Sequence, residues 1–371
     1  MIAPTEPFAT MEVPERAVRL REAMADAEVP ALLVTSLPNI RYLTGFTGSA
    51  ALLLVTERGL TFVTDGRYGQ QAQDQLRAAG VDAAIEVSST AQRQAVSGAL
   101  GASGARRLGL EAEAVTWAAQ RTYADSWFPD VELIPTTGLV GRLRVVKDDG
   151  EIDRLAAAAA IADGALAEVR PLLCEGPTEV EFGLALDAAM RALGADDVSF
   201  ETIVASGPNG AKPHHRPGPR IVQEGDLVVI DFGALVDGYH SDMTRTVAVG
   251  EISATQQRMW DVVLAAQAAG VQAVAAGVEA REVDAACRSV IAEAGWADAF
   301  LHGTGHGVGL DIHEEPRVAH TSTATLVDRC VVTVEPGVYL PEHGGVRIED
   351  TVVVTPDGCR PLTLTPKIAA V

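Results

Sequence analysis

Two aspartates in a β-type stretch, residues 227–249, are the first groups whose spacing suggests chemistry. The stretch reads LVVIDFGALVDGYHSDMTRTVAV and contains a turn-like segment at residues 236–238, so it predicts a β-hairpin. A pairing centred between the first two turn residues places Asp231 directly across from Asp242, and a bulge in the turn would shift this by one residue. Because opposed carboxylates destabilise a hairpin, we predict that they share a proton or hold a cation such as manganese, magnesium, zinc or cobalt.

A second stretch, residues 331–354, repeats this pattern in the sequence VVTVEPGVYLPEHGGVRIEDTVVV. Glu335 and Glu349 lie symmetrically about Glu342, which falls within a predicted loop at residues 341–345. The sequence therefore predicts a second hairpin with a second pair of facing carboxylates. One such pair would usually be a solvated pair of surface acids, but two pairs within β-branched sequence favour a function.

A glycine-rich segment between the two hairpins carries three histidines, His302, His306 and His313. Its sequence, residues 301–315, is LHGTGHGVGLDIHEE, and four glycines in seven residues exclude a stable helix and with it the zincin pattern. The segment lacks the GxGxxG register, and the sequence contains no GxxxxGK[ST] motif, so nucleotide binding is poorly supported. Glycine lets a backbone approach a bound ion or peptide, and imidazole can bind a metal or carry a proton.

Three further side chains are candidates with open roles. His214 and His215 lie in a turn-rich loop, residues 206–217, and could equally be solvated. Arg347 lies two residues before Glu349 and therefore on the same face of the strand. Its guanidinium could neutralise that carboxylate, hold a substrate carboxylate or form a purely structural ion pair.

Four carboxylates and one histidine can together hold two divalent ions about 3.5–4 Å apart, the arrangement of two-metal hydrolases. Such ions lower the pKa of a bound water towards about 7 and polarise a carbonyl group. A nearby glutamate can then transfer the proton. The residues therefore predict peptide or amide hydrolysis, although their spacing does not identify the bond that is cut.

The N-terminal third alternates helical and strand patterns, which predicts a small α/β domain. The segments that we expect to be helical are residues 15–27, 68–79 and 91–100, and the expected strands are residues 31–36, 52–55 and 60–64. Turn signals occur at residues 37–39 and 57–59, and residues 135–141 have the composition of a loop. We therefore place a domain boundary near Gly141.

The remaining sequence predicts two helices followed by strands, twice over. The helical windows are residues 152–173 and 178–193 in the first half, and 254–276 and 280–294 in the second. This order suggests a weak internal duplication.

The composition of the chain argues against several classes of function. The 371 residues include 50 acidic and 29 basic side chains, giving a formal charge of −21 that would repel nucleic acid. Four widely spaced cysteines form no metal-binding pattern and are interpreted as reduced structural thiols. The first thirty residues lack the apolar core of a signal peptide, and no run of 18 apolar residues occurs. We expect a cytoplasmic protein that binds neither nucleic acid nor membrane.

The ordered motifs IDFG, SDMTRT, HGTGHGVGLDIHEEP, VEPGVY and GVRIEDTVVV resemble those of the pita-bread metallopeptidases, in the branch of aminopeptidase P and prolidase. This resemblance covers about residues 147–366. The segments NIRYLTGFTGSAALLLV and TFVTDGRYGQQA resemble the creatinase-type first domain of the same branch. The resemblance implies an α/β creatinase-like domain over residues 1–141 and an α+β pita-bread catalytic domain with an internal pseudo-duplication over residues 142–371.

The resemblance also implies a role for each candidate residue. The implied metal ligands are Asp231, Asp242, His306, Glu335 and Glu349, with Asp242 and Glu349 bridging two ions and Glu335 also accepting a proton from the attacking water. His214, His302 and His313 match the histidines that contact substrate and handle protons, and Arg347 matches an arginine near the bridging glutamate. Members of this branch cut the bond between an N-terminal residue and proline, use manganese, cobalt or zinc, and commonly form homodimers.

Several alternatives remain open at this point. Methionine aminopeptidase lacks a creatinase-type first domain, and creatinase lacks the metal ligands, so both fit poorly. A catalytically silent binding protein on the same fold is a third alternative, which the intact ligand set disfavours. Within the favoured branch, an Xaa-Pro aminopeptidase and an Xaa-Pro dipeptidase share every motif above. We favour the aminopeptidase, with manganese as the expected metal.

Overall fold

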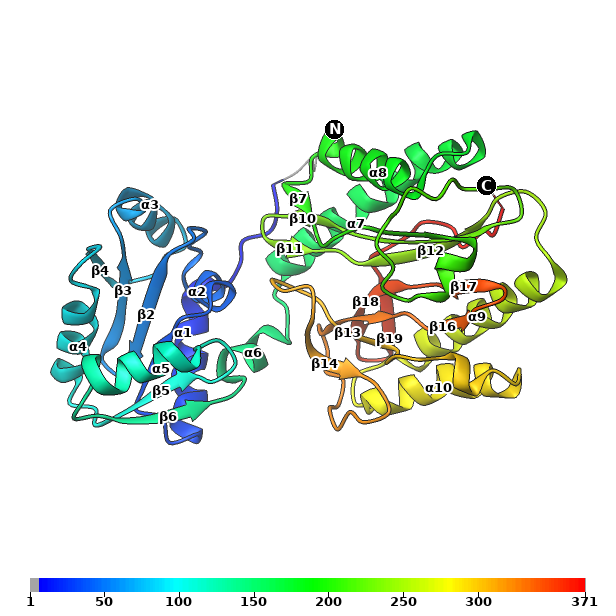
Figure 1. Ribbon diagram of the computed structural model, residues 1–371. Coiled ribbons are helices and arrows are strands. Elements are labelled where there is room, and N and C mark those ends of the chain that lie inside the picture. The colour runs from blue at the N-terminus through cyan, green and yellow to red at the C-terminus, as the bar shows by residue number, and fades with distance from the viewer. Residues whose placement is uncertain (1–6, 371) are drawn as a thin grey trace. The chain divides into compact units, whose positions relative to one another are not determined.

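The computed structural model describes residues 7–370, which divide into two compact units (Figure 1). The smaller unit is Met11–Arg144, and the larger unit contains residues 7–10 and everything from Val145 onwards. The boundary between the two units lies between Arg144 and Val145, three residues after Gly141, near which the sequence predicts a domain boundary. Residues 7–10 join the larger unit rather than the first domain because the Phe8 ring packs 4.9 Å from the Arg154 guanidinium.

The smaller unit is built on a mixed six-stranded sheet in the order β4-β3-β2-β1-β5-β6. The strands are β1 (Ala31–Val34), β2 (Ala51–Thr56), β3 (Gly59–Thr64), β4 (Ala84–Val87), β5 (Arg107–Glu111) and β6 (Glu132–Thr136). The helices are α1 (Val13–Asp26), α2 (Leu37–Thr44), α3 (Gly69–Ala78), α4 (Gln92–Ser103), α5 (Trp117–Thr122), the π-helix η1 (Tyr123–Trp127) and α6 (Leu139–Arg144). The predicted α/β alternation is confirmed.

Two predicted loops in this unit are wrong. Residues 37–39 begin the helix α2, because Pro38 lies in its first turn, where a fixed φ and a missing N–H are compatible with a helix. Residues 135–141 end β6 and begin α6. Pro135 is accommodated in β6 because that strand lies at the edge of the sheet, where it needs no partner on one side.

The larger unit contains a pair of long helices before each set of strands. The first half comprises α7 (Asp149–Val169), η2 (Arg170–Glu175), α8 (Glu179–Leu193), β7 (Asp197–Val198), β8 (Ile203–Ser206), η3 (Gly207–Ala211), β9 (Leu227–Phe232), β10 (Ala234–Val236), β11 (Tyr239–His240) and β12 (Met243–Ala248). The second half comprises α9 (Ala254–Ala273), α10 (Ala280–Glu293), η4 (Ala297–Ala299), β13 (Gly305–Gly307), β14 (Glu314–Val318), β15 (Val331–Val334), β16 (Gly337–Leu340), β17 (Gly344–Arg347), β18 (Asp350–Thr355) and β19 (Gly358–Pro361). Capping boxes at Asp148, Thr178 and Ser253 fix where α7, α8 and α9 begin.

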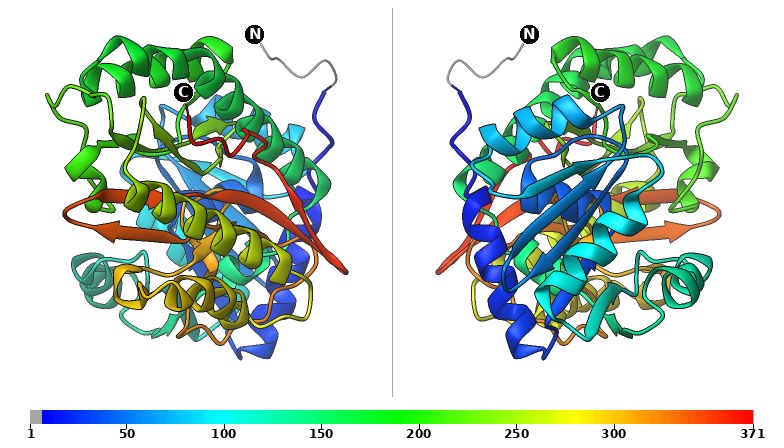
Figure 2. Two further views of the ribbon diagram at one scale, coloured as in Figure 1. Left: turned by 90° about the vertical axis from the view of Figure 1, so that its right-hand side faces the viewer. Right: turned by 90° about the vertical axis from the view of Figure 1, so that its left-hand side faces the viewer.

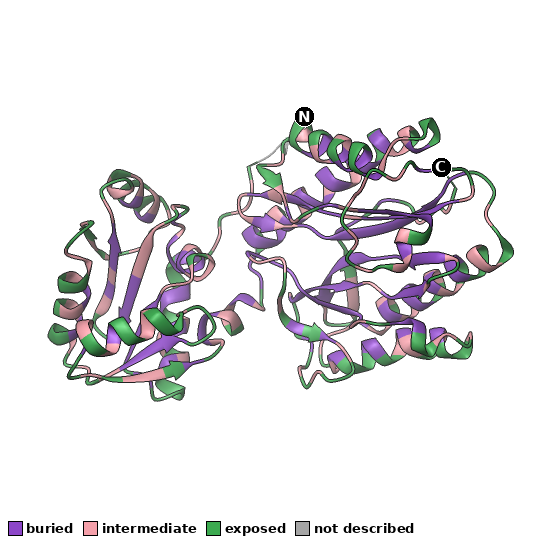
Figure 3. Cartoon of the chain, in the orientation of Figure 1, coloured by how far each residue is buried: buried purple, intermediate pink, exposed green. Residues whose placement is uncertain are grey.

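Buried strands in this unit lie between helices whose outer faces are exposed (Figure 3). The apolar faces of α7 and α8 pack with β8, β9, β10 and β12 into one core. The helices α9 and α10, which lie side by side in Figure 2, pack with β15 to β18 into another. The strand orders are β12-β9-β8 and β14-β13-β15-β18-β19, with smaller sheets β11-β10-β7 and β16-β17.

The two predicted hairpins form, but only one has the predicted register. In the second, Val331 pairs with Val353 and Gly337 with Arg347, which is the symmetry about Glu342 that the sequence predicts. In the first, Asp231 faces Thr244 rather than Asp242. The turn has two residues, Asp237 and Gly238, both with positive φ (44° and 72°), and this moves the centre of pairing by one residue.

No helix within residues 7–370 is both long enough and apolar enough to cross a membrane.

Candidate metal centre

Three predicted ligands from different elements meet in the interior of the larger unit. One ligand atom from each of Asp242, His306 and Glu349 lies within 4.8 Å of the other two, and all three residues are buried. Asp242 directly precedes β12, His306 is the central residue of β13 and Glu349 directly precedes β18. Close packing of these strand ends therefore produces the cluster.

Glu335, which directly follows β15, lies next to this cluster. Its Oε1 is 3.6 Å from His306 Nε2, which also lies 3.5 Å from Asp242 Oδ2. The main-chain carbonyl of Gly307 is 2.9 Å from His306 Nδ1, so that nitrogen is the donor and Nε2 is free to bind a metal. Burial lowers the pKa of His306 to about 4, which keeps the ring neutral, as a ligand must be.

Asp231 completes the set of five around one cavity. Although the register differs by two residues from the prediction, an even shift leaves Asp231 and Asp242 on the same face of the hairpin. Arg347 Nη2 lies 2.6 Å from Asp231 Oδ2, while Asp231 Oδ1 is buried without a hydrogen-bond partner. Of the roles that the sequence left open for Arg347, the structure shows an ion pair, and its partner is Asp231 rather than Glu349.

The electrostatics of the centre fit divalent cations. Burial, followed by the neighbouring carboxylates, raises the pKa of Asp242 and Glu349 well above the usual range, and burial raises the pKa of Glu335 to about 8. Four carboxylates share a single buried cation, Arg347. Carboxylate oxygens and one neutral imidazole are donors that suit manganese, cobalt or zinc, and the unpartnered Asp231 Oδ1 is a further vacant donor.

The cluster opens into a cavity of about 440 Å³ that the remaining predicted residues also line. The lining includes His214, His302, His313 and Arg347, together with the apolar side chains of Phe200, Ile203 and Ile312 and the guanidinium-bearing Arg317. The His313 ring lies edge-on to the His306 ring, with the centroids 4.4 Å apart. All nine predicted site residues, including the five candidate metal ligands, therefore line one cavity.

Sequence comparison assigns this chain to a known family. Residues 153–356, more than half of the chain, match metallopeptidase family M24, and residues 16–146 match the creatinase/prolidase N-terminal domain. The chain belongs to metallopeptidase family M24. It is a metallopeptidase with a creatinase-type first domain and a pita-bread catalytic domain, and the fold class and family resemblance predicted from the sequence are confirmed.

Members of the M24 family with two named activities resemble the whole chain. The Xaa-Pro dipeptidase of Pyrococcus horikoshii is 33% identical over 353 residues, which cover 95% of this chain and 97% of that protein. The structure of an Xaa-Pro dipeptidase from Bacillus anthracis matches with a TM-score of 0.92 at 40% identity, covering 96% of this chain and 99% of the other. The X-Pro aminopeptidase from Thermotoga maritima matches with a TM-score of 0.85 at 33% identity, covering 94% and 100%.

A residue that the sequence analysis missed, Tyr339, links two of the predicted M24 site residues. The hydroxyl of Tyr339 lies 2.8 Å from His302 Nε2 and 2.9 Å from Arg347 Nη1. His302 Nδ1 lies 2.8 Å from the carbonyl of Gly303, so Nδ1 donates and Nε2 accepts the tyrosine proton. The tyrosine belongs to the VEPGVY motif, but strand alternation alone did not show which of its side chains faces the site.

His215, whose role the sequence left open, holds the loop that carries His214. Its Nε2 lies 2.8 Å from Oε2 of Glu179, which is fully buried at the start of α8. Glu179 Oε1 also accepts hydrogen bonds from the main-chain N–H and the hydroxyl of Ser206 and from Asn209 Nδ2. The two adjacent histidines therefore differ, because His214 lines the cavity while His215 anchors its loop.

The glycines of the M24 segment at residues 302–309 serve strand packing. A Cβ atom on Gly305 would lie 2.0 Å from the carbonyl oxygen of Thr333, and one on Gly307 would lie 2.3 Å from that of Glu315. From the sequence, these glycines are expected to let the backbone approach a bound ion or peptide. They instead let β13 fit between β14 and β15, which places His306 beside Glu335.

Proposed function

We propose that the chain is an Xaa-Pro dipeptidase, a prolidase that releases free proline from Xaa-Pro dipeptides. From the sequence alone, the aminopeptidase is favoured, with the dipeptidase as the alternative. Two of the three similar proteins described above carry the name Xaa-Pro dipeptidase, and one of them has the higher TM-score, 0.92 against 0.85. These comparisons support the alternative better than the original choice.

The observation that carries the proposal is the position of Arg317. This residue of β14 lines the cavity, and within residues 7–370 its guanidinium makes no hydrogen bond or ion pair. The other cavity arginine, Arg347, is already bound to Asp231, Thr244 and Tyr339. A dipeptide ends in a carboxylate immediately after proline, and an uncommitted guanidinium near the metal centre provides the bidentate partner that such a group prefers.

The side chains divide the work of hydrolysis between them. Two divalent ions held by the five predicted ligands would supply Lewis acidity and a water of lowered pKa. Glu335 accepts the proton of the attacking water and delivers it to the proline nitrogen that leaves. The rings of His214 and His313, which form no hydrogen bond within residues 7–370, face the cavity and donate to the oxyanion that forms at the scissile carbonyl.

His302 has a different part in this scheme, because both of its ring nitrogens are already engaged. Burial lowers its pKa to about 4, so the ring stays neutral and accepts from Tyr339. We propose that His302 orients the tyrosine hydroxyl and, through it, Arg347. Manganese as the metal, the homodimer and the cytoplasmic location belong to the same proposal and rest on the sequence analysis.

The deciding experiment compares substrates of different length with the manganese-loaded chain. We expect Ala-Pro and Met-Pro to be cleaved, and Ala-Pro-Gly and the amide of Ala-Pro to be cleaved far more slowly, because neither presents a carboxylate next to proline. Cleavage of the tripeptide at a rate equal to that of the dipeptide would establish the aminopeptidase instead.

Arg317→Ala sharpens this comparison. A hydrogen bond to a charged group is worth about 1.5–3 kcal/mol, so the variant should raise KM for Ala-Pro about tenfold to a hundredfold. Arg317→Lys should raise this KM less than Arg317→Ala does. Neither variant should change the slow turnover of the amide. A KM for Ala-Pro that is unchanged in Arg317→Ala would remove this arginine from substrate recognition.

A further inference from the structure

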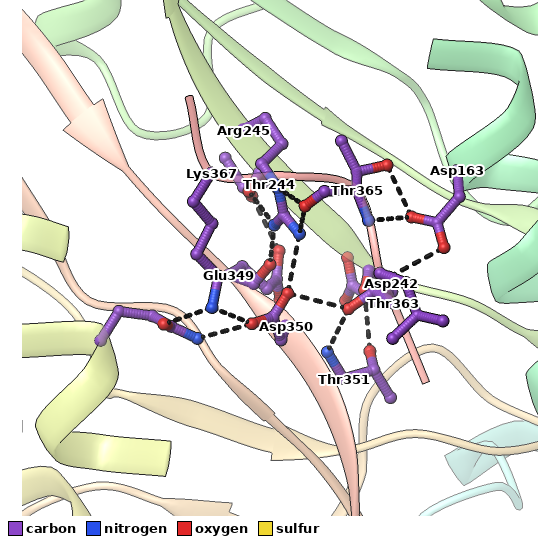
Figure 4. Close-up of polar contacts among 12 residues, drawn as sticks. Asp163, Asp242, Thr244, Arg245, Glu349, Asp350, Thr351, Thr363, Thr365 and Lys367 are labelled. Carbon is purple, nitrogen blue, oxygen red and sulfur yellow. Dashed lines mark hydrogen bonds and ion pairs between the residues drawn. The ribbon is translucent and has the colours of Figure 1, made fainter. Parts of the chain in front are cut away.

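A buried ion pair lies behind the metal centre, formed by Arg245 of β12 and Asp350 of β18. Arg245 Nη2 lies 2.8 Å from Asp350 Oδ1 (Figure 4). Both side chains are almost fully buried. Neither residue lines the substrate cavity. Strand alternation explains this, because Asp350 follows the ligand Glu349 directly and so points to the opposite side.

The pair binds the main chain of the ligand-bearing strands. Arg245 Nη1 donates to the carbonyl of Glu349 and, at 3.0 Å, to the carbonyl of Thr244. Next to it, the hydroxyl of Thr351 donates at 2.7 Å to the carbonyl of Asp242. The main chain of the two carboxylate ligands that meet at the centre is therefore fixed from behind.

Residues 362–367 follow β19 and contact this ion pair, and we name them the strap. The main-chain N–H of Leu362 donates to the carbonyl of Thr351 at 2.9 Å. The carbonyl of Thr365 accepts from Arg245 Nε at 3.1 Å and from Nη2 at 2.7 Å. Lys367 Nζ forms an ion pair with Asp350 Oδ2, so that this carboxylate is bound by two cations (Figure 4).

Two helices anchor the strap and the carboxylate that it binds. Asp163 of α7 accepts from the main-chain N–H groups of Leu364 and Thr365, each at 2.8 Å, and from the Thr365 hydroxyl at 2.6 Å. Gln267 of α9 donates to Asp350 Oδ2 at 3.0 Å and accepts from Lys367 Nζ at 2.8 Å. The strap thus connects both helical layers to the strands that carry Asp242 and Glu349.

We propose that the strap is a positioning element of the metal centre, in which Lys367 and Asp163 set metal affinity by holding Arg245 and Asp350 behind Glu349. Metal ligands must be held within about 0.5 Å of their binding geometry, and residues behind the ligands commonly change affinity tenfold to a hundredfold. Lys367 and Asp163 contact neither the cavity nor the five ligands, so they act only through the residues between. The inference rests on the metal centre of the proposed function and not on which peptide is cut.

The test measures metal binding directly. Lys367→Met in the full chain, depleted of metal and titrated with Mn²⁺ in a calorimeter, should raise the dissociation constant about tenfold. Lys367→Arg keeps the cation and should restore binding to within about twofold of the wild type. Arg360→Met is the matched control and should bind Mn²⁺ normally. Arg360 is an exposed cation on the adjacent strand β19, and within residues 7–370 its side chain makes no hydrogen bond or ion pair.

Asp163→Ala provides an independent route to the same result, since it releases the strap from α7 and leaves Lys367 in place. We expect weaker Mn²⁺ binding here as well, and in both variants kcat should recover when Mn²⁺ is raised to saturation. Wild-type Mn²⁺ affinity in Lys367→Met and Asp163→Ala, with only a lower melting temperature, would overturn the proposal. A wild-type chain that binds Mn²⁺ but does not cleave Xaa-Pro dipeptides would contradict the proposed substrate alone.

Discussion

At the scale of single residues, a continuous chain of hydrogen bonds joins the metal centre to the cavity wall. It runs from Asp231 through Arg347 and the Tyr339 hydroxyl to His302, with contacts of 2.6, 2.9 and 2.8 Å. Each member is oriented by the next, because a guanidinium only donates and the neutral His302 Nε2 only accepts. Removing Tyr339 or His302 should therefore disturb the neighbouring members without removing a metal ligand.

Tyr339→Phe tests this chain of contacts. The variant leaves Arg347 Nη1 and His302 Nε2 without their shared partner, and the loss of about 1 kcal/mol for a neutral hydrogen bond predicts a fall in kcat of about fivefold to tenfold. His302→Ala should lower kcat at least as much. Bound manganese, measured by atomic emission after dialysis, should equal that of the wild type in both variants. Wild-type kcat in both would exclude these residues from the mechanism.

At the scale of elements, the position of His313 depends on a buried ion pair at the start of β14. Lys147 Nζ lies 3.1 Å from Glu314 Oε2, and the two side chains are only 1% and 6% exposed. Glu314 Oε1 also accepts from the main-chain N–H of Asp311 at 3.1 Å, so the pair fixes the turn that carries His313. Loss of the cation would remove the positive charge of Lys147 from beside this buried carboxylate.

Lys147→Met should consequently be strongly destabilising. Breaking a buried pair from one side costs about 3–5 kcal/mol, and we expect a loss of about that size in the free energy of unfolding measured with urea. The double variant Lys147→Met with Glu314→Gln should lose less stability, since it also removes the buried negative charge. Arg191→Met, which breaks the exposed pair with Asp197, is the control and should cost under about 1 kcal/mol. Equal stability of Lys147→Met and the control would contradict this role.

At the scale of the whole molecule, the metal centre links stability to pH. Burial raises the pKa of Glu335 to about 8 from an ordinary value of 4.5, and Asp242 and Glu349 shift in the same direction. The folded metal-free protein therefore binds protons more strongly than the unfolded chain does. The stability that these three carboxyls contribute is fully present below their unfolded pKa. It is lost as pH rises towards their folded pKa.

The metal-free protein should accordingly melt at a lower temperature at about pH 8 than at about pH 5. Manganese replaces the protons as counter-charge, so the melting temperature of the loaded protein should exceed that of the metal-free protein by more at the higher pH. Asp242→Asn removes one of the shifted carboxyls and should show a smaller dependence on pH when metal-free. The melting temperature of the metal-free wild type could instead rise between about pH 5 and pH 8, and more steeply than that of Asp242→Asn. That result would contradict the raised pKa values of these carboxyls.

A structural feature of this protein can be predicted from the sequence when the interactions that fix it are local in the chain. The register of the second hairpin could be predicted because Glu335 and Glu349 are symmetrical about a short loop, and pairing across a short loop is local. The register of the first could not, because Asp237 and Gly238 both adopt positive φ, which moved the centre by one residue. The even shift kept Asp231 and Asp242 on one face, so the acidic cluster formed despite the error.

The sequence by itself determined the elements, the two-unit α/β and pita-bread architecture, the family and the set of candidate ligands, because periodicity, turn residues and motif spacing are encoded locally. Only the tertiary structure decided which partner each side chain takes. Tyr339, Glu179 and Lys367 bind partners that are distant in the sequence, and no local pattern encodes those contacts. Whether a buried polar or charged group is satisfied depends on such contacts.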